Sequence, residues 1–286
     1  MTLRLERLCG IADEGAFALD DQLALHTDMG LAGIELRATS GRLLHELSDG
    51  AFASLRAAIT GRGLLVPVVC TPIGSWGRSL AHPIEDDLDL LRIYARRARA
   101  LGCTRLRIMS YPNDGRADAA WREEVLTRLA TLAAAAGQDG VMLLHENCSG
   151  WASQHADATV EMLEHVGDER LRLVFDVGND AARGADGYAY LERVLPWVEH
   201  VHVKDVVFDG RAARFVLPGD GDARVLDALA LLSSSSFAGW ISAEPHLANV
   251  PHMSQSAPDP ILARTYRAAV GRLRELVGDT CDAPAR

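Results

Sequence analysis

Val141-Met142-Leu143-Leu144-His145-Glu146 and Leu171-Arg172-Leu173-Val174-Phe175-Asp176 are two short, β-prone runs that both end in a carboxylate. A helical pattern near Thr159 to Val166 lies between them. A strand, a helix and a second strand in this order form a βαβ unit, whose two strands are parallel. The two runs therefore indicate an α/β fold built around a parallel sheet.

The same unit recurs along the whole chain of 286 residues, which contains eight such runs. Eight strands favour closure into a (β/α)8 barrel, the TIM barrel, over an open doubly wound sheet, and the length is normal for a barrel of about 250 residues. The open dinucleotide-binding alternative also needs a GxGxxG motif after the first run, and none is there. The other six runs are Leu5–Ile11, Gly33–Arg37, Leu64–Cys70, Arg105–Ser110, His200–Asp205 and Gly239–Glu244.

Helical patterns separate nearly all of these runs. We see no linker that would divide the chain, so residues 1–286 are expected to form a single TIM-barrel domain with a frayed tail over 278–286. Further helices are expected around Asp20 to Met29, after the N-cap Ser48-Asp49, from Pro83 onward, over Leu129 to Ala136 and over Pro260 to Val277.

The bulk composition argues against several classes of protein. Apolar residues make up 48% and charged residues 24%, as in a soluble globular protein, and no span of about 20 apolar residues predicts a membrane helix. The beginning of the chain lacks a signal-peptide pattern, and the five scattered cysteines form no CxxC pair, so we expect a cytoplasmic protein. The net charge of −10, without a basic run, argues against a nucleic acid partner.

Polar side chains gather where the runs end, which is where the active site of such a barrel lies. Carboxylates and imidazoles that meet at one barrel mouth repel one another or lose their charge unless a cation neutralises them. Three carboxylates with one imidazole suit a cation such as Mn²⁺, Mg²⁺ or Co²⁺, with positions left open for substrate oxygens. The polar residues at the run ends are Glu35, Arg37, His145, Glu146, Asn147, Asp176, Asn179, His200, His202, Lys204, Glu244 and His246.

These run ends resemble those of the xylose isomerase-like barrel superfamily of sugar isomerases, epimerases and related enzymes. In that superfamily a Glu on strand five, an Asp on strand six, a His on strand seven and a Glu on strand eight bind one metal ion. The matching positions are Glu146 in HENCSG, Asp176 in FDVGND, His202 in HVHVKD and Glu244 in SAEPH. The resemblance implies one divalent ion, with Mn²⁺ expected ahead of Mg²⁺, Co²⁺ or Zn²⁺.

Two readings compete with this one. Structural salt bridges would explain one or two of the four residues but not all of them. A nuclease is disfavoured, because many members of the superfamily, including DNA-repair endonucleases with three zinc ions, have a His where this chain has Asn179.

Four residues are candidates for the proton chemistry. The resemblance implies that Glu146 and Glu244 move a proton on and off carbon. His145 is a candidate general base, although strict alternation along a strand turns it away from the face of Glu146. Lys204 shares a face with His202 and could stabilise an enolate; an ion pair with Asp205 or Asp176 is the alternative reading.

A second group of residues is expected to bind substrate, and each has a structural alternative. Glu35 and Arg37 could instead form an ion pair, and Arg214 could be a solvated loop charge. Trp76 could stack on a sugar ring, as could Trp151, or either could belong to the core. The candidates for substrate binding are Glu35, Arg37, Trp76, Asn179, Arg214 and His246.

The resemblance implies a metal-dependent sugar isomerase or epimerase that abstracts a proton beside a carbonyl and forms an enediolate. Elimination from the same intermediate would make the chain a lyase, like inosose dehydratases or the catalytic subunits of 3-oxo-glycoside and C-glycoside deglycosidases. A non-catalytic sugar-binding or partner subunit is the third hypothesis. The expected ligand is a small carbohydrate, and a homo-oligomer or a complex with a second subunit stays open.

Overall fold

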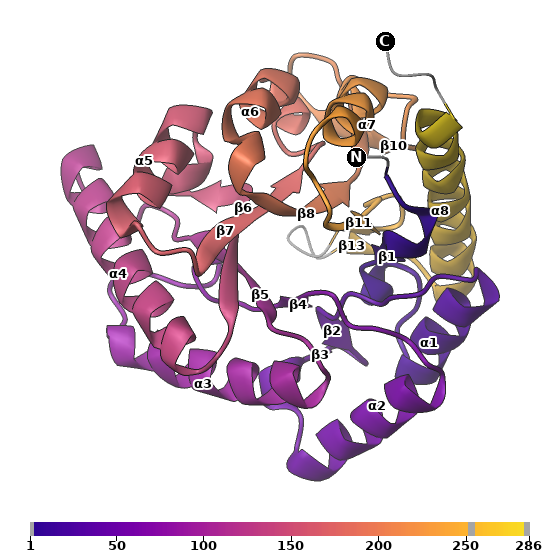
Figure 1. Ribbon diagram of the computed structural model, residues 1–286, viewed down its shortest axis with the longest axis horizontal. Coiled ribbons are helices and arrows are strands. Elements are labelled where there is room, and N and C mark those ends of the chain that lie inside the picture. The colour runs from indigo at the N-terminus through magenta and orange to yellow at the C-terminus, as the bar shows by residue number, and fades with distance from the viewer. Residues whose placement is uncertain (1–2, 251–254, 283–286) are drawn as a thin grey trace.

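The computed structural model describes residues 3–250 and 255–282. In these residues seven parallel strands form one curled sheet (Figure 1). The strand of this sheet that comes first in the chain, β1, pairs with the one that comes latest in the chain, β11. Helices surround the sheet, so the predicted TIM barrel is confirmed. In the order of the sheet, the strands are β1 (Leu8–Gly10), β11 (Trp240–Ala243), β8 (Val198–Val203), β7 (Leu171–Asp176), β6 (Met142–Gly150), β5 (Arg105–Ser110) and β4 (Val69–Cys70).

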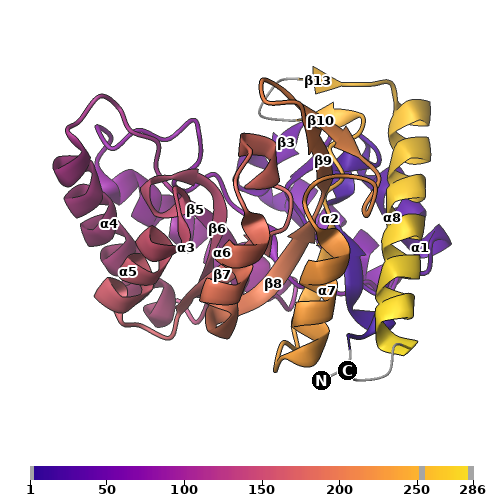
Figure 2. The same cartoon turned by 90° about the horizontal axis from the view of Figure 1, so that it is seen from above.

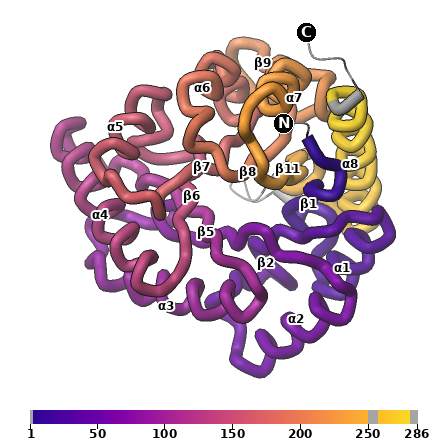
Figure 3. Tube along the Cα trace, viewed as in Figure 1, coloured from indigo at the N-terminus to yellow at the C-terminus, as the bar shows by residue number. Residues whose placement is uncertain are grey.

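The α-helices follow one another around the sheet in sequence order (Figure 3). Several begin where the sequence indicates: the Ser48 hydroxyl accepts a hydrogen bond from the Ala51 N–H at the start of α2, and Pro83 directly precedes α3. The helices are α1 (Leu19–Asp28), α2 (Asp49–Gly61), α3 (Ile84–Ala100), α4 (Asp118–Gln138), α5 (Ala156–Val166), α6 (Gly187–Val194), α7 (Val225–Ser234) and α8 (Asp259–Asp282), with short 3-10 helices at Leu5–Arg7, Ala12–Glu14, Leu44–Glu46, Trp151–Ser153, Ala181–Arg183 and Leu195–Trp197.

The second predicted run, Gly33–Arg37, lies between β1 and β4 without forming a regular strand. Its Glu35 N–H donates to the Gly10 carbonyl oxygen (2.9 Å), and its Ile34 N–H donates to the Leu65 carbonyl oxygen (2.8 Å). Isolated parallel bridges on both sides join it to the two edges of the seven-stranded sheet. This segment therefore takes the place of the eighth strand and closes the barrel.

Three predicted boundaries are wrong. Residues 5–7 of the first run form a 3-10 helix, and the third run forms a strand only over Val69–Cys70, because Pro67 has no N–H for the ladder. The last helix continues to Asp282, beyond its predicted end at Val277. The rest of the predicted tail, 283–286, lies outside the described residues.

Within the residues that the structure describes, three small antiparallel hairpins follow the carboxyl ends of barrel strands or of the segment 33–37. They are β2 (Ala38–Thr39) with β3 (Arg42–Leu43), β9 (Asp205–Phe208) with β10 (Ala213–Val216), and β12 (Asn249–Val250) with β13 (Gln255–Ser256). Figure 2 shows β3, β10 and β13 at the same end of the barrel. The hairpins thus surround the mouth at which active sites of this fold lie.

The turn Pro218-Gly219-Asp220-Gly221 is held to β9 by one buried carboxylate. Asp205 accepts hydrogen bonds from the backbone N–H groups of Gly219 (2.8 Å), Gly221 (3.0 Å) and Ala223 (3.1 Å). Asp205 therefore has a structural role.

The hydrophobic core fills the space between the strands and the helices, and a small separate cluster of Val68, Leu144 and Val174 is buried with it. None of the helices in residues 3–250 and 255–282 is long and apolar enough to cross a membrane.

Candidate active site

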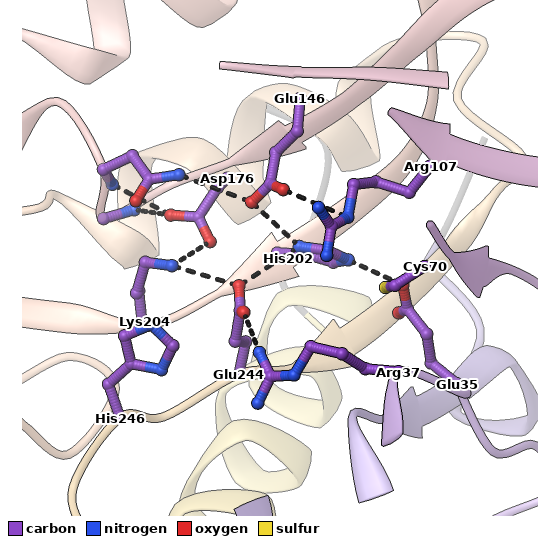
Figure 4. A network of polar contacts seen from close by, with 12 residues as sticks. Glu35, Arg37, Cys70, Arg107, Glu146, Asp176, His202, Lys204, Glu244 and His246 are labelled. Atoms are coloured by element: carbon purple, nitrogen blue, oxygen red, sulfur yellow. Dashed lines mark hydrogen bonds and ion pairs between the residues drawn. The ribbon is translucent and has the colours of Figure 1, made fainter. Parts of the chain in front are cut away.

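Four buried side chains at the carboxyl ends of neighbouring strands face one another. Glu146 comes from β6, Asp176 ends β7, His202 comes from β8 and Glu244 directly follows β11. One nitrogen or oxygen atom of each residue lies within 4.8 Å of the corresponding atoms of the other three (Figure 4). No more than 5% of any of these residues is exposed. The four positions that sequence reasoning assigned to a metal ion therefore meet at one place, and we call them the quartet.

Two basic groups lie among the carboxylates of the quartet. The Lys204 ammonium is 2.9 Å from Asp176 Oδ2 and 3.0 Å from Glu244 Oε2. His202 Nδ1 is 3.2 Å from Glu244 Oε2 and 3.4 Å from Glu146 Oε1. Of the two ion-pair partners expected as alternatives for Lys204, Asp176 is paired with it, whereas Asp205 binds backbone N–H groups of the turn 218–223.

Two arginines hold the outer oxygens of the two glutamates. Arg37 Nη1 donates to Glu244 Oε1 (2.8 Å), and Arg107 Nε is 3.4 Å from Glu146 Oε2. Each glutamate thus turns one oxygen toward the quartet and the other toward a guanidinium group.

The electrostatics of the quartet favour a further cation. Burial raises the pKa of Asp176 to about 7, and Lys204 offsets only part of this effect. Burial also disfavours ionised Glu146, but Arg107 and His202 bring its pKa below the ordinary value. Burial disfavours ionised Glu244 as well, yet Lys204 and His202 hold its pKa well below the usual range.

A divalent ion fits the charge balance of this region. The contact network around the quartet contains more carboxylates than basic side chains, by three when the histidines are neutral. One divalent ion would reduce the excess from three negative charges to one, and three carboxylates with one imidazole suit such an ion. The carboxylates are Asp13, Glu14, Glu35, Glu146, Asp176 and Glu244, and the basic residues are Arg37, Arg107 and Lys204.

A cavity of about 380 Å³ opens above the quartet. Trp76, which is 52% exposed, and Phe215 of β10 give part of its wall an apolar character. The predicted site residues that line it are Arg37, Trp76, Glu146, Asn179, Lys204, Glu244 and His246.

Asn179 lies close to the quartet. Its amide nitrogen is 3.5 Å from Glu146 Oε1, and its backbone N–H donates to Asp176 Oδ1 (2.8 Å). It therefore orients two of the carboxylates.

Two predicted site residues lie away from the cavity. His145 is fully buried, does not line the cavity and has its Nε2 3.4 Å from Ser153 Oγ. Burial lowers its pKa to about 4. Because its side chain lies outside the cavity wall, its position does not support the predicted role as general base. Arg214 is exposed on β10, and the strand alternation places its neighbour Phe215 in the cavity wall instead.

Glu35 does not lie where a substrate-binding residue was expected, and Trp151 takes the second of its two expected positions, in the core. Glu35 is fully buried outside the cavity wall, where it contacts His200 and His202 rather than a substrate. Trp151 is 8% exposed and packs in the core near the Arg122 guanidinium, 5.9 Å from its ring centroid. It does not line the cavity.

Sequence reasoning missed Arg107, Phe215 and Glu14. A buried arginine in the middle of an apolar strand was the signal for Arg107. Glu14 follows the first strand closely, and its carboxylate accepts from the His246 backbone N–H (2.8 Å) and lies 2.7 Å from His246 Nδ1. These contacts accompany the left-handed φ of 52° at His246.

Comparison with known proteins agrees with the fold. Residues 23–275 match the family model of the xylose isomerase-like TIM barrel. A relative described as inosose dehydratase, from Klebsiella pneumoniae, is 26% identical in an alignment of 214 positions that covers 66% of this chain and 67% of that protein. With the first curated relatives, also inosose dehydratases, the match spans only about half of their length.

Solved structures support the fold independently. The 3-keto-D-glucoside 4-epimerase YcjR from E. coli has a TM-score of 0.69 at 16% identity, covering 93% of this chain and 98% of that one. The IolI protein with a bound zinc atom has a TM-score of 0.75 at 16% identity, covering 97% and 100%. Since the family model covers most of the barrel, this chain belongs to the xylose isomerase-like TIM barrel family.

Proposed function

We propose that the chain is a divalent-metal-dependent enzyme that removes a proton beside the ketone of an uncharged, polyhydroxylated ring compound and then eliminates water. The observation that carries the proposal is the quartet of Glu146, Asp176, His202 and Glu244 beneath a cavity. The curated relatives described as inosose dehydratases favour elimination as the outcome.

The quartet would hold the ion. A bound divalent cation would polarise a carbonyl oxygen and so acidify the neighbouring C–H bond. We propose Mn²⁺ as the native ion, ahead of Mg²⁺, Co²⁺ and Zn²⁺.

The two glutamates are the candidate bases, because both line the cavity and both are held ionised. One carboxylate takes the proton from carbon, and the electron pair of the C–H bond passes into an enediolate. When the C–O bond of the adjacent carbon breaks, the same carboxyl group returns the proton to the leaving oxygen, which departs as water. Lys204 lines the cavity and can donate a hydrogen bond to the oxygen that gains negative charge.

The charge pattern of the cavity wall favours an uncharged substrate. Arg37 contacts Glu14 and Glu244, and Arg183 contacts Asp180 at 2.6 Å. Lys204 and Arg107 are likewise paired with carboxylates of the quartet. An anionic substrate would restore the negative excess that a divalent ion removes, whereas hydroxyl groups can accept and donate hydrogen bonds without changing it.

Epimerisation or isomerisation is the second candidate, because Glu146 and Glu244 approach His202 Nδ1 as a pair. One glutamate could take the proton and the other return it, on the opposite face of the same carbon or on the neighbouring carbon. A non-catalytic sugar-binding subunit is the third hypothesis and predicts binding without turnover.

The test uses purified protein with Mn²⁺ in D2O and a panel of inososes and 3-keto-glucosides, followed by ¹H NMR and by ultraviolet absorbance. Dehydration produces an enone that absorbs in the ultraviolet, whereas epimerisation incorporates deuterium without that absorbance. Glu244→Gln should abolish either reaction, and the exposed control Arg214→Gln should leave it unchanged. Metal-loaded protein that catalyses neither on any member of the panel would contradict the proposal and favour the binding subunit.

A further inference from the structure

A chain of three buried side chains leads from the quartet into the interior of the barrel. His202 Nε2 is 2.9 Å from Glu35 Oε1, and His200 Nε2 is 2.9 Å from Glu35 Oε2. At most 1% of each of the three residues is exposed. His202 therefore has one nitrogen directed at the quartet and the other at Glu35 (Figure 4).

The contacts of Glu35 place a proton on Nε2 of both rings. An ionised carboxylate only accepts hydrogen bonds, so both histidines donate through Nε2. The carboxylates of Glu146 and Glu244 face Nδ1 and favour a proton there. A divalent ion bound in place of that proton would leave a neutral ring that donates through Nε2 and has its lone pair on Nδ1. A histidine that binds metal must present this lone pair.

Glu35 is held in place from three directions. Its backbone N–H bonds to the Gly10 carbonyl oxygen, its Oε1 also accepts from the Cys70 thiol (3.2 Å), and its Oε2 accepts from His200. The carboxylate is therefore a rigid acceptor rather than a flexible group at the mouth of the cavity.

We propose that Glu35 is a positioning residue for metal binding: its carboxylate holds His202 in the Nε2–H tautomer and orients Nδ1 toward the ion. The proposal rests on the metal site of the proposed function. Glu35 touches neither substrate nor ion in this arrangement, and it acts through His202 alone.

The experiment measures the Kd for Zn²⁺ by competition with a chelator for the wild type and the variants Glu35→Gln, Glu35→Ala and His200→Gln. Removal of a partner of a metal-binding histidine typically weakens metal binding 10- to 100-fold. We expect about 10-fold weaker binding for Glu35→Gln, whose amide can still accept one hydrogen bond, and a larger loss for Glu35→Ala. His200→Gln keeps the bond between Glu35 and His202, so its Kd should change less than about threefold.

Long-range ¹H–¹⁵N correlation spectra of the zinc-loaded protein give a second readout. They should place the His202 proton on Nε2 in the wild type and show faster exchange of this proton in Glu35→Ala. Thermal unfolding of each metal-free variant checks that it is folded. A Glu35→Ala protein that is folded and binds Zn²⁺ as tightly as the wild type would overturn the inference, and so would equal losses in the Glu35 and His200 variants.

Failure of the proposed function gives a different pattern. A wild-type protein without any measurable affinity for Zn²⁺ or Mn²⁺ removes the metal site, and the positioning role falls with it. Tight wild-type binding with unaffected Glu35 variants overturns the positioning role and leaves the proposed function standing.

Discussion

Replacement of His145 by leucine tests whether this histidine is a structural residue or a catalytic base. The imidazole is fully buried, and in the residues that the structure describes its Nδ1 has no hydrogen-bond partner. Its weak contact at 3.4 Å is with Ser153 Oγ, which also donates to the carbonyl oxygens of Glu146 (3.1 Å) and Ser149 (3.0 Å). Leucine therefore removes a titrating group and leaves the hydroxyl with its other partners.

The size of the effect of His145 on the free energy of unfolding follows from its pKa, which burial lowers from the ordinary value of 6.5 to about 4. Between these two pH values the unfolded chain binds a proton that the folded chain does not, so the free energy of unfolding falls as the pH falls. The full shift corresponds to about 3.4 kcal/mol, of which about 2 kcal/mol is lost between pH 7 and pH 5.

Urea denaturation of the wild type and His145→Leu at pH 7 and pH 5 measures this contribution. Between pH 7 and pH 5 the free energy of unfolding of the wild type should fall by about 2 kcal/mol more than that of the variant, because all other titrating groups are common to both. The variant should also keep its turnover at pH 7. Equal losses in the two proteins would refute the claim that the His145 imidazole is neutral in the folded protein. Lost turnover in a folded variant would indicate that His145 takes part in the proton transfer.

Steady-state kinetics and metal titration check three further predictions. Arg107→Gln removes the charge that orients Glu146 and should lower kcat or metal affinity about 10- to 100-fold; a change below threefold would mean that the orientation of Glu146 does not depend on it. Trp76→Ala should raise KM about fivefold at a nearly constant kcat, since the exposed ring contributes about 1 kcal/mol of contact with the substrate, and an unchanged KM would exclude that contact. Arg214→Gln should leave both constants within twofold of the wild type, because this side chain is exposed and outside the cavity wall; a larger loss would mean that β10 moves when substrate binds.

The sequence predicts the barrel well because the patterns that indicate its strands and helices are local. Runs such as Leu171–Asp176 and the helices between them are visible in stretches of a few residues, and strand alternation places His202 and Lys204 on one face. The segment Gly33–Arg37 shows the limit: it was expected as a strand, and it lies at the strand position, but its pairing is reduced to isolated bridges.

The candidate site is predictable only in part, because a run end identifies a strand position but not the contacts that a side chain makes there. The quartet follows from four run ends and their resemblance to a family pattern. Glu35 also stands at a run end, but its partners His200 and His202 come from β8, so only the closed barrel reveals that it faces a histidine rather than a substrate. The partnership of Glu14 with His246, which lie at opposite ends of the chain, is equally invisible to local patterns.

The central claim is that Glu146, Asp176, His202 and Glu244 bind one divalent ion. Metal analysis by mass spectrometry tests it most directly, on the wild type and on Asp176→Asn, each before and after EDTA treatment and reloading with Mn²⁺. The account predicts about one Mn, Mg, Co or Zn per wild-type chain, removed by EDTA and restored by reloading, and little or none in folded Asp176→Asn. A wild-type protein that holds no metal even after exposure to excess Mn²⁺, or an Asp176→Asn protein that binds as much as the wild type, would contradict it.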